Sequence, residues 1–205
     1  MKSEERLKED KAEAIISTAQ KRFGLYGIEK TTMREIASDL KMSKASLYYY
    51  FPDKESLYRS VISREHNEFL KILQSEINTI SDPVQCLMKY ALIRLSHFRR
   101  LINLSRLRLA SYNELKPVIA DSLKSFREEE IKIIMQILDK GKTEKLFKIE
   151  DTYNTATLFL DLLKGLRSAF LTGKDLLVIN ETEYRTLSEK VKEIVEIFIK
   201  GLMYK

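Results

Sequence analysis

Apolar residues recur along the chain with the spacing of amphipathic helices. In residues 5–25 they follow one another at i, i+3, i+4, i+7 and i+11, which places them on one helix face: Ala12, Ile15, Ile16, Ala19 and Phe23. No stretch alternates apolar and polar residues in the way of a half-buried strand. The pattern therefore predicts an all-α fold. Further helices are predicted over residues 54–80, 83–98, 101–112, 118–140, 152–172 and 188–203.

Residues 32–51 contain the signals for two short helices joined by a tight turn. Thr32 and Glu35 have the spacing of a capping box, so each can satisfy a free backbone amide at the start of the first helix. Ser43 can cap a second helix, 44–51, and Asp53 a third. Helices of two turns are unstable alone in water, so these two must pack on each other and on the helix before them. This arrangement is typical of a helix-turn-helix.

Composition excludes several classes of protein. The 205 residues include only 6 Gly and 3 Pro, which argues against a turn-rich β protein. The longest run without a charged residue, 152–160, is far shorter than the roughly 18 residues of a membrane-spanning helix, and no secretory signal precedes it. A single cysteine, Cys86, agrees with a cytoplasmic protein. His66 and His97 have no cysteine partners, so we expect no metal site.

Charge alone does not identify a function. The net charge is +6, and residues 83–113 hold six basic and no acidic side chains. This mild excess permits nucleic-acid binding without indicating it. No nucleotide-binding loop, paired catalytic carboxylates or nucleophile–base set is recognisable, so we expect no catalytic residues, no enzymatic activity and no cofactor.

Three stretches carry a resemblance to a known family: Phe23-Gly-x-x-Gly27, Thr31-Thr-x-Arg-Glu-Ile-Ala37, and Ser43-Lys-Ala-Ser-Leu-Tyr-Tyr-Tyr-Phe-Pro-Asp-Lys-Glu-Ser-Leu57. Over about residues 8–70 the chain resembles the DNA-binding domain of the TetR (tetracycline-repressor-like) family of bacterial transcription regulators. The resemblance implies a three-helix DNA-binding domain at 1–52, with its motif at 32–51. It also implies a larger helical domain at 53–205 for ligand binding and dimerisation.

Two positions depart from the family pattern. Lys41 stands where the turn usually has Gly, and a left-handed conformation there would cost about 1 kcal/mol. Ala45 stands where Gly is common, which suits a helix.

Reading the major groove requires a narrow helix with small or flexible side chains at its start. Residues 44–51 have this character, and cations or free helix amides flank them for phosphate contacts. A solvated polar face is the alternative. The predicted DNA-binding residues are Thr31, Thr32, Arg34, Lys41, Ser43, Lys44, Ala45, Ser46, Tyr48, Tyr49 and Lys54.

A pseudo-palindromic operator is read by two copies of such a motif, so a homodimer is expected. The helix at 152–172 has one apolar stripe through Phe159 and another through Leu158, Leu162, Leu166 and Ala169, and it must be covered on both sides. Burial of both stripes within one monomer is the alternative. The predicted dimerisation residues are Phe159, Leu163, Leu166, Phe170, Val191, Ile194, Val195, Phe198 and Leu202.

The resemblance implies regulation by a small molecule in the C-terminal domain, with an apolar, amphipathic or anionic effector fitting the composition of its helices. Candidate effector contacts are Tyr90, Arg94, His97, Arg108 and Tyr112. Alternatively these cations are solvated, or pair with acids of 61–82 or 128–130. The function expected is a ligand-responsive repressor that binds double-stranded DNA. The alternative is a helical protein that binds a partner or a membrane surface through the basic segment 83–113.

Overall fold

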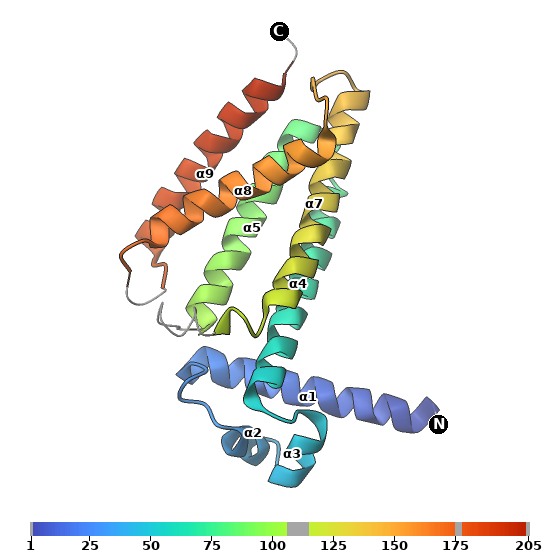
Figure 1. Cartoon of the computed structure of the whole chain (residues 1–205), viewed down its shortest axis with the longest axis vertical. Coiled ribbons are helices and arrows are strands. Elements are labelled where there is room, and N and C mark those ends of the chain that lie inside the picture. The colour runs from blue at the N-terminus through green and yellow to red at the C-terminus, as the bar shows by residue number, and fades with distance from the viewer. Residues whose placement is uncertain (1, 106–114, 175–177, 204–205) are drawn as a thin grey trace. The chain divides into compact units, whose positions relative to one another are not determined.

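The computed structural model describes residues 2–105, 115–174 and 178–203, with side chains from residue 5 and excluding those of 102–105. Within these ranges the chain is helical and has no β-strand, which confirms the all-α prediction (Figure 1). The helices are α1 (Lys2–Tyr26), α2 (Met33–Asp39), α3 (Lys44–Tyr50), α4 (Lys54–Ile77), α5 (Pro83–Ser105), α7 (Ala120–Thr143), α8 (Thr152–Leu171) and α9 (Glu181–Leu202).

Three predicted helix bounds were wrong. The break at residues 99–100 is absent, because two arginines interrupt the apolar pattern without interrupting the helix, and α5 continues to Ser105. Helix α7 continues past Gly141, where a Cβ would collide with the ring of Phe147. Helix α9 begins seven residues before the prediction, at a capping box formed by Asn180 and Glu183.

The chain divides into two compact units. The first contains residues 1–66 with 101–122 and 175–178, and the second contains 67–100, 123–174 and 179–205. Helix α4 contributes its first half to the first unit and its second half to the other.

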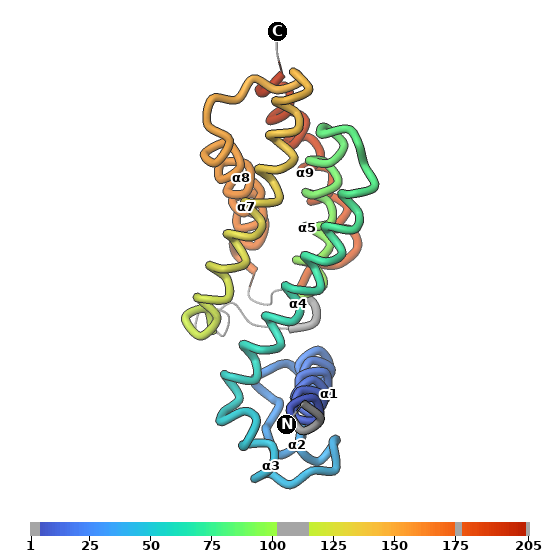
Figure 2. Tube along the Cα trace, turned by 90° about the vertical axis from the view of Figure 1, so that its right-hand side faces the viewer, coloured from blue at the N-terminus to red at the C-terminus, as the bar shows by residue number. Residues whose placement is uncertain are grey.

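The first unit holds the two short helices against α1. Figure 2 views α1 almost end on, with α2 and α3 to one side of it. Ile36 of α2 and Leu47 of α3 are fully buried, as is Ala19 of α1. Arg22 of α1 donates from Nε and Nη2 to the two carboxylate oxygens of Asp39, at 2.5 and 2.9 Å, and so joins α1 to the end of α2. These contacts supply the tertiary support that helices of seven residues require.

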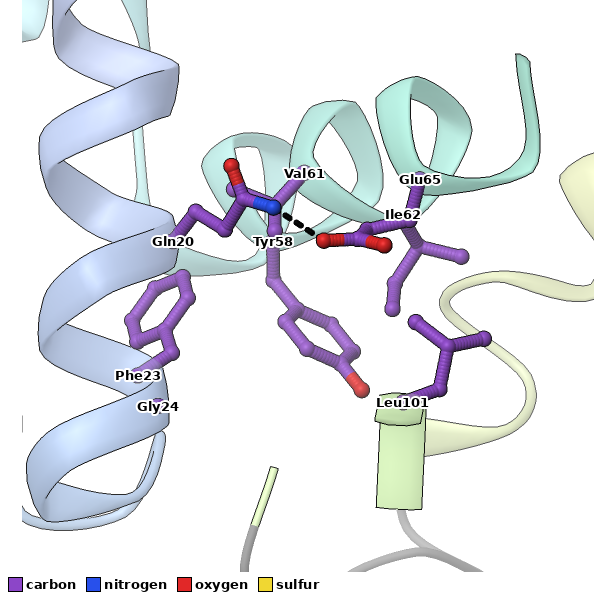
Figure 3. Close-up of a pocket in the computed structure, with 8 residues that line it drawn as sticks. All are labelled: Gln20, Phe23, Gly24, Tyr58, Val61, Ile62, Glu65 and Leu101. Atoms are coloured by element: carbon purple, nitrogen blue, oxygen red, sulfur yellow. Dashed lines mark hydrogen bonds between the residues drawn. The ribbon is translucent and has the colours of Figure 1, made fainter. Parts of the chain in front are cut away.

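A small cavity lies inside the first unit between α1 and α4 (Figure 3). The side-chain amide of Gln20 donates to the buried carboxylate of Glu65, and the rings of Phe23 and Tyr58 meet edge to face with centroids 5.9 Å apart. About 20 Å³ remains open at its centre, roughly the space of one water molecule.

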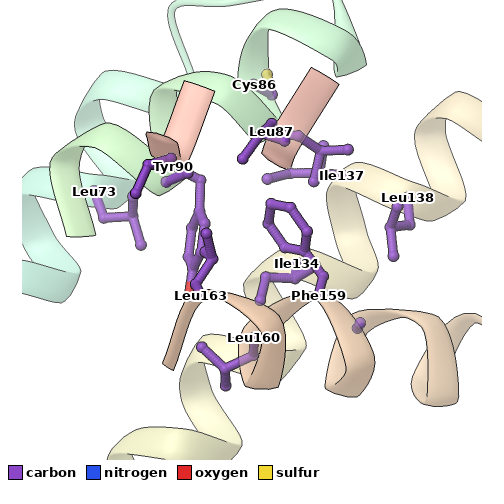
Figure 4. Close-up of a cluster of buried hydrophobic side chains, with 14 of the residues drawn as sticks. Leu73, Cys86, Leu87, Tyr90, Ile134, Ile137, Leu138, Phe159, Leu160 and Leu163 are labelled. Carbon is purple, nitrogen blue, oxygen red and sulfur yellow. The ribbon is translucent and has the colours of Figure 1, made fainter. Parts of the chain in front are cut away.

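The second unit is a bundle formed by the second half of α4 with α5, α7, α8 and α9 (Figure 1). Figure 4 shows its centre, where Leu87, Ile134 and Leu160 come together from three helices. The ring of Phe159 lies between those of Tyr90 and Phe198, with centroid distances of 6.1 and 4.9 Å. The core of this unit is built from the inward faces of α4, α5, α7, α8 and α9.

Candidate functional site

The start of α2 is fixed by a capping box. Thr32 Oγ1 accepts from the Glu35 amide at 3.3 Å, and the Glu35 carboxylate accepts from the Thr32 amide at 2.8 Å, so the predicted capping box is present. The hydroxyl and the backbone amide of Thr32, which both donate to that carboxylate, lower the pKa of Glu35. Both hydrogen bonds fix where α2 begins.

Helix α2 ends in a Schellman motif with Lys41 in the left-handed position. The Lys41 amide donates to the carbonyl of Ser38 and the Met42 amide to that of Ala37, both at 3.0 Å. Lys41 has a φ of 51°, the conformation that the family's Gly adopts without strain. The turn is thus formed with a lysine, whose side chain is exposed beside the start of α3.

Helix α3 presents a polar and aromatic face to solvent. Ser43 Oγ accepts from the Ser46 amide at 3.0 Å, while Leu47 and Phe51 are buried and fix the rotation of the helix. The remaining predicted groove-reading side chains are exposed, and Tyr49 is 70% accessible. These exposed residues are Ser43, Lys44, Ala45, Ser46, Tyr48 and Tyr49.

Two lysines lie over the tyrosine rings of this face. The ammonium of Lys44 is 5.4 Å from the ring centre of Tyr48, and that of Lys8 on α1 is 5.1 Å from the ring centre of Tyr49. Arg34 and Lys41 are also exposed, on α2 and in the turn. Cations therefore surround the aromatic side chains, as contact with a phosphate backbone and base edges requires.

Two of the predicted DNA-contact residues have a structural role in the first unit. Thr31 is fully buried, and its hydroxyl donates to the carbonyl of Gly27 at 2.9 Å. The ammonium of Lys54 donates to the carbonyls of Ile28 and Thr31, at 3.0 and 3.3 Å. Both side chains thus hold the segment between α1 and α2, because its carbonyls lack helical partners.

The described effector candidates lie in the second unit and are buried. Tyr90 and Arg94 both donate to Glu130 Oε1, at 2.7 and 2.6 Å, and Arg94 Nη2 lies 3.4 Å from Glu130 Oε2. Burial, with the neighbouring Glu130 carboxylate, raises the pKa of Tyr90 well above its usual value. His97 stacks on the ring of Phe69 with centroids 4.5 Å apart. Arg108 and Tyr112 lie outside the described residues.

Cations of the basic segment pair with acids, which the alternative interpretation anticipated for acids of 61–82 and 128–130 but not for Glu181. Besides Arg94, Lys89 lies 2.8 Å from Glu76 and Arg99 2.7 Å from Glu181, and Arg100 lies 3.7 Å from Glu68. The described part of 83–113 is therefore not an unpaired basic surface that would attract a membrane or an acidic partner.

The structure corrects part of the predicted dimer interface. Phe159, Leu163, Val191 and Val195 are buried inside a single chain, where they fill the core of the second unit. Leu166, Phe170, Ile194, Phe198 and Leu202 are partly exposed. The other stripe of α8 is the exposed one, with Leu158 59% and Leu162 36% accessible. Ile197 of α9 is also exposed.

In the sequence, residues 128–130 are possible partners of the basic segment, but sequence reasoning did not single out Glu130 as the buried one. It is the single acid in the otherwise apolar stripe of α7 that includes Phe126, Ile134 and Gly141, and that position is the signal that could have identified it. Lys164 and Arg167 of α8 were also missed. Burial, together with the neighbouring Arg127 and Arg94, lowers the pKa of Lys164 to about 8.

Among the described residues, no three His, Cys, Asp or Glu side chains gather where they could hold a metal ion. None of the described helices is both long enough and apolar enough to cross a membrane.

Comparison with known proteins matches both the motif and the whole fold. Residues 15–61 match the model of the family described as bacterial regulatory proteins, tetR family. The crystal structure of a transcriptional regulator from Cytophaga hutchinsonii is 40% identical, with a TM-score of 0.85 over 95% of this chain and 99% of that one. An uncharacterised HTH-type transcriptional regulator, YxaF of Bacillus subtilis, is 26% identical over 81% of this chain and 87% of its own length.

A third relative extends over nearly the whole chain. The negative transcriptional regulator IcaR of the Staphylococcus epidermidis biofilm operon is 25% identical over 91% of this chain and 97% of its own length. With the capped pair α2–α3 and the helical bundle that follows it, these matches show that the chain is a DNA-binding transcription regulator and belongs to the TetR family of bacterial regulatory proteins.

Proposed function

We propose that this protein is a dimeric repressor that binds a pseudo-palindromic operator through α3 and is released by a small molecule bound in its second unit. The exposed face of α3 carries the proposal. Ser43 caps the helix, buried Leu47 fixes its rotation, and Tyr48 and Tyr49 extend into solvent beside lysines. A tyrosine can contact a thymine methyl with its ring and a phosphate with its hydroxyl.

Base reading is assigned to the start of α3, and phosphate contact to the exposed cations around it. Lys44, Ala45 and Ser46 occupy the first turn of the helix, the part that approaches base edges in this class of motif. Arg34 and Lys41 are exposed on the preceding helix and turn. Each cation that contacts a phosphate adds affinity that falls with salt and does not depend on sequence.

Dimerisation is assigned to the exposed apolar stripe of α8 with the neighbouring α9. Leu158, Leu162 and Ala169 lie on the face of α8 opposite its core contacts, and Ile197 lies on α9. A monomer gains nothing by exposing several large apolar side chains on adjacent helices, whereas a twofold partner would bury them.

Repression and ligand release rest on the family. IcaR, whose name describes a negative regulator, is similar along nearly the whole chain. We assign DNA binding to the first unit, and ligand binding and dimerisation to the second. Lys89, Arg94, Arg99 and Arg100, the cations of 83–113 that the structure describes, all pair with acids, which does not favour the partner-binding or membrane alternative.

Binding to the DNA upstream of the protein's own gene tests the proposal. Fluorescence anisotropy at about 0.1 M salt should show specific binding, with a scrambled fragment as competitor. Tyr49→Ala removes the most exposed groove-reading ring and should weaken specific binding at least tenfold. Tyr153→Ala is the matched control, because Tyr153 is similarly exposed but lies on α8. Equal loss in both variants, or none in either, would contradict the assignment.

A further inference from the structure

A cluster of charged side chains from α5, α7 and α8 lies in the otherwise apolar second unit. It contains three cations, Arg94, Arg127 and Lys164, and two carboxylates, Glu130 and Asp161. Arg127 binds Asp161 through both guanidinium arms, at 2.5 and 3.0 Å, and Arg94 binds Glu130. Cations therefore outnumber acids in this cluster, which is consistent with the lowered pKa of Lys164.

Arg94 also lines a pocket between α5, α8 and α9. Its bonds to Glu130 use two of the five N–H donors of the guanidinium. Arg167 contributes a second guanidinium, which lies 4.3 Å from the ring centre of Phe98. The other lining residues are apolar: Ala91, Leu95, Leu163, Leu187 and Val191.

The lining residues of the pocket differ in their exposure to solvent. Phe98 and Arg167 are partly exposed, whereas Arg94 and the aliphatic residues are buried. The open space is about 10 Å³, so any ligand larger than a water molecule must displace side chains of the lining. A ligand enters only if the side chains of Phe98 and Arg167 part.

We propose that this pocket takes an amphipathic organic anion, whose carboxylate binds Arg167 and Arg94 and whose hydrocarbon part packs among the aliphatic side chains. The proposal deepens the ligand response of the proposed function and rests on it. Two guanidiniums in an apolar wall favour an anion over a neutral or cationic ligand, because each can donate charge-assisted hydrogen bonds to a carboxylate. A carboxylate also offsets the excess of cations beside the pocket.

Three probes with hydrocarbon tails of seven or eight carbons separate the charge preference from simple apolar binding. Octanoate, 1-octanol and octyltrimethylammonium are titrated into the full-length protein by calorimetry, below the concentrations at which they form micelles. Octanoate should bind about tenfold or more tightly than the alcohol, and the cation should bind least. Equal affinity for octanoate and octanol, or no binding of octanoate, would overturn the proposal.

Two variants locate the anion. Arg167→Gln should weaken octanoate binding about tenfold or more and leave octanol binding unchanged. Arg185→Gln is the matched control, because Arg185 is an exposed arginine of α9 outside the pocket, and it should bind octanoate like the unaltered protein. If Arg167→Gln binds octanoate with unchanged affinity, the assigned anion site is wrong.

A measurement on the unaltered protein covers the case in which a variant fails to fold. Methyl NMR of leucine- and valine-labelled protein should show the largest octanoate-induced shifts at Leu163, Leu187 and Val191. Shifts confined to other methyl groups would overturn the proposal. Operator binding without ligand is measured separately by anisotropy. Its absence would contradict the proposed function while the octanoate titration still decides the pocket.

Discussion

Glu130 should be among the most costly residues of the second unit to replace. It is fully buried, as its partner Arg94 nearly is, and the two are joined by a 2.6 Å hydrogen bond. Glu130→Leu removes the carboxylate and leaves a buried guanidinium without that counter-charge, which costs about 3–5 kcal/mol. Because folded proteins are stable by only about 5–15 kcal/mol, the urea midpoint should fall steeply.

The stability lost in Glu130→Leu should return in steps when its polar partners Arg94 and Tyr90 are also replaced. Arg94→Met combined with Glu130→Leu removes both charges but leaves the hydroxyl of Tyr90 without its acceptor, a loss of about 1–3 kcal/mol. Adding Tyr90→Phe removes that hydroxyl, so the triple variant should approach the original stability. Replacing a buried pair by apolar side chains of similar volume is often neutral.

Urea unfolding at one protein concentration, followed by circular dichroism, measures each free energy of unfolding. Glu129→Leu is the control, since Glu129 is the exposed neighbour that pairs with Lys132 at the surface, and it should have little effect. A cost below about 1 kcal/mol for Glu130→Leu, or a double variant as unstable as the sum of its singles, would refute the reasoning.

The other predictions concern the turn, the dimer and the charge cluster. Lys41→Gly should stabilise the protein by about 1 kcal/mol in urea by relieving the left-handed strain, whereas Lys41→Ala, which keeps that strain, should not. Leu158→Asp should yield a folded monomer in light scattering, because the Leu158 side chain is exposed. Phe159→Asp should unfold the second unit, because the Phe159 side chain is buried, and a folded monomer from both variants would contradict this. Lys164 has a folded pKa of about 8, below its usual 10.5, so stability should rise as pH increases from 8 to 10.5. Lys164→Met should abolish that rise and add about 1–2 kcal/mol at pH 7, a value reduced for partial exposure; an unchanged pH profile would contradict it.

The helix-turn-helix could be predicted from the sequence because its signals are local. The capping residues Thr32, Ser43 and Asp53 act on amides within three residues, and each forms the cap that its position predicts. The left-handed conformation of Lys41 was indicated by the family resemblance, because the family usually has Gly at that position. Such features depend on neighbours in the chain and not on the rest of the fold.

The second unit could not be predicted at the same depth because its outcome depends on tertiary packing. Leu158 and Phe159 both lie on apolar stripes of α8, and periodicity alone does not say which stripe the other helices cover. Lys54 is a cation beside a DNA-binding motif, yet two carbonyls from distant residues hold its ammonium. In the sequence Gly141 indicates a helix end, but in the structure the ring of Phe147 occupies the space that a side chain at 141 would need.

Photo-crosslinking tests most directly whether α3 is the surface that enters DNA. Benzoylphenylalanine placed at Tyr49 should crosslink to a bound operator fragment on irradiation, and the same group at Tyr153 should not, although both positions are exposed. Crosslinks at Tyr49 that a specific competitor abolishes are the predicted result. A saturated complex that crosslinks only from Tyr153, or from neither position, would contradict the account.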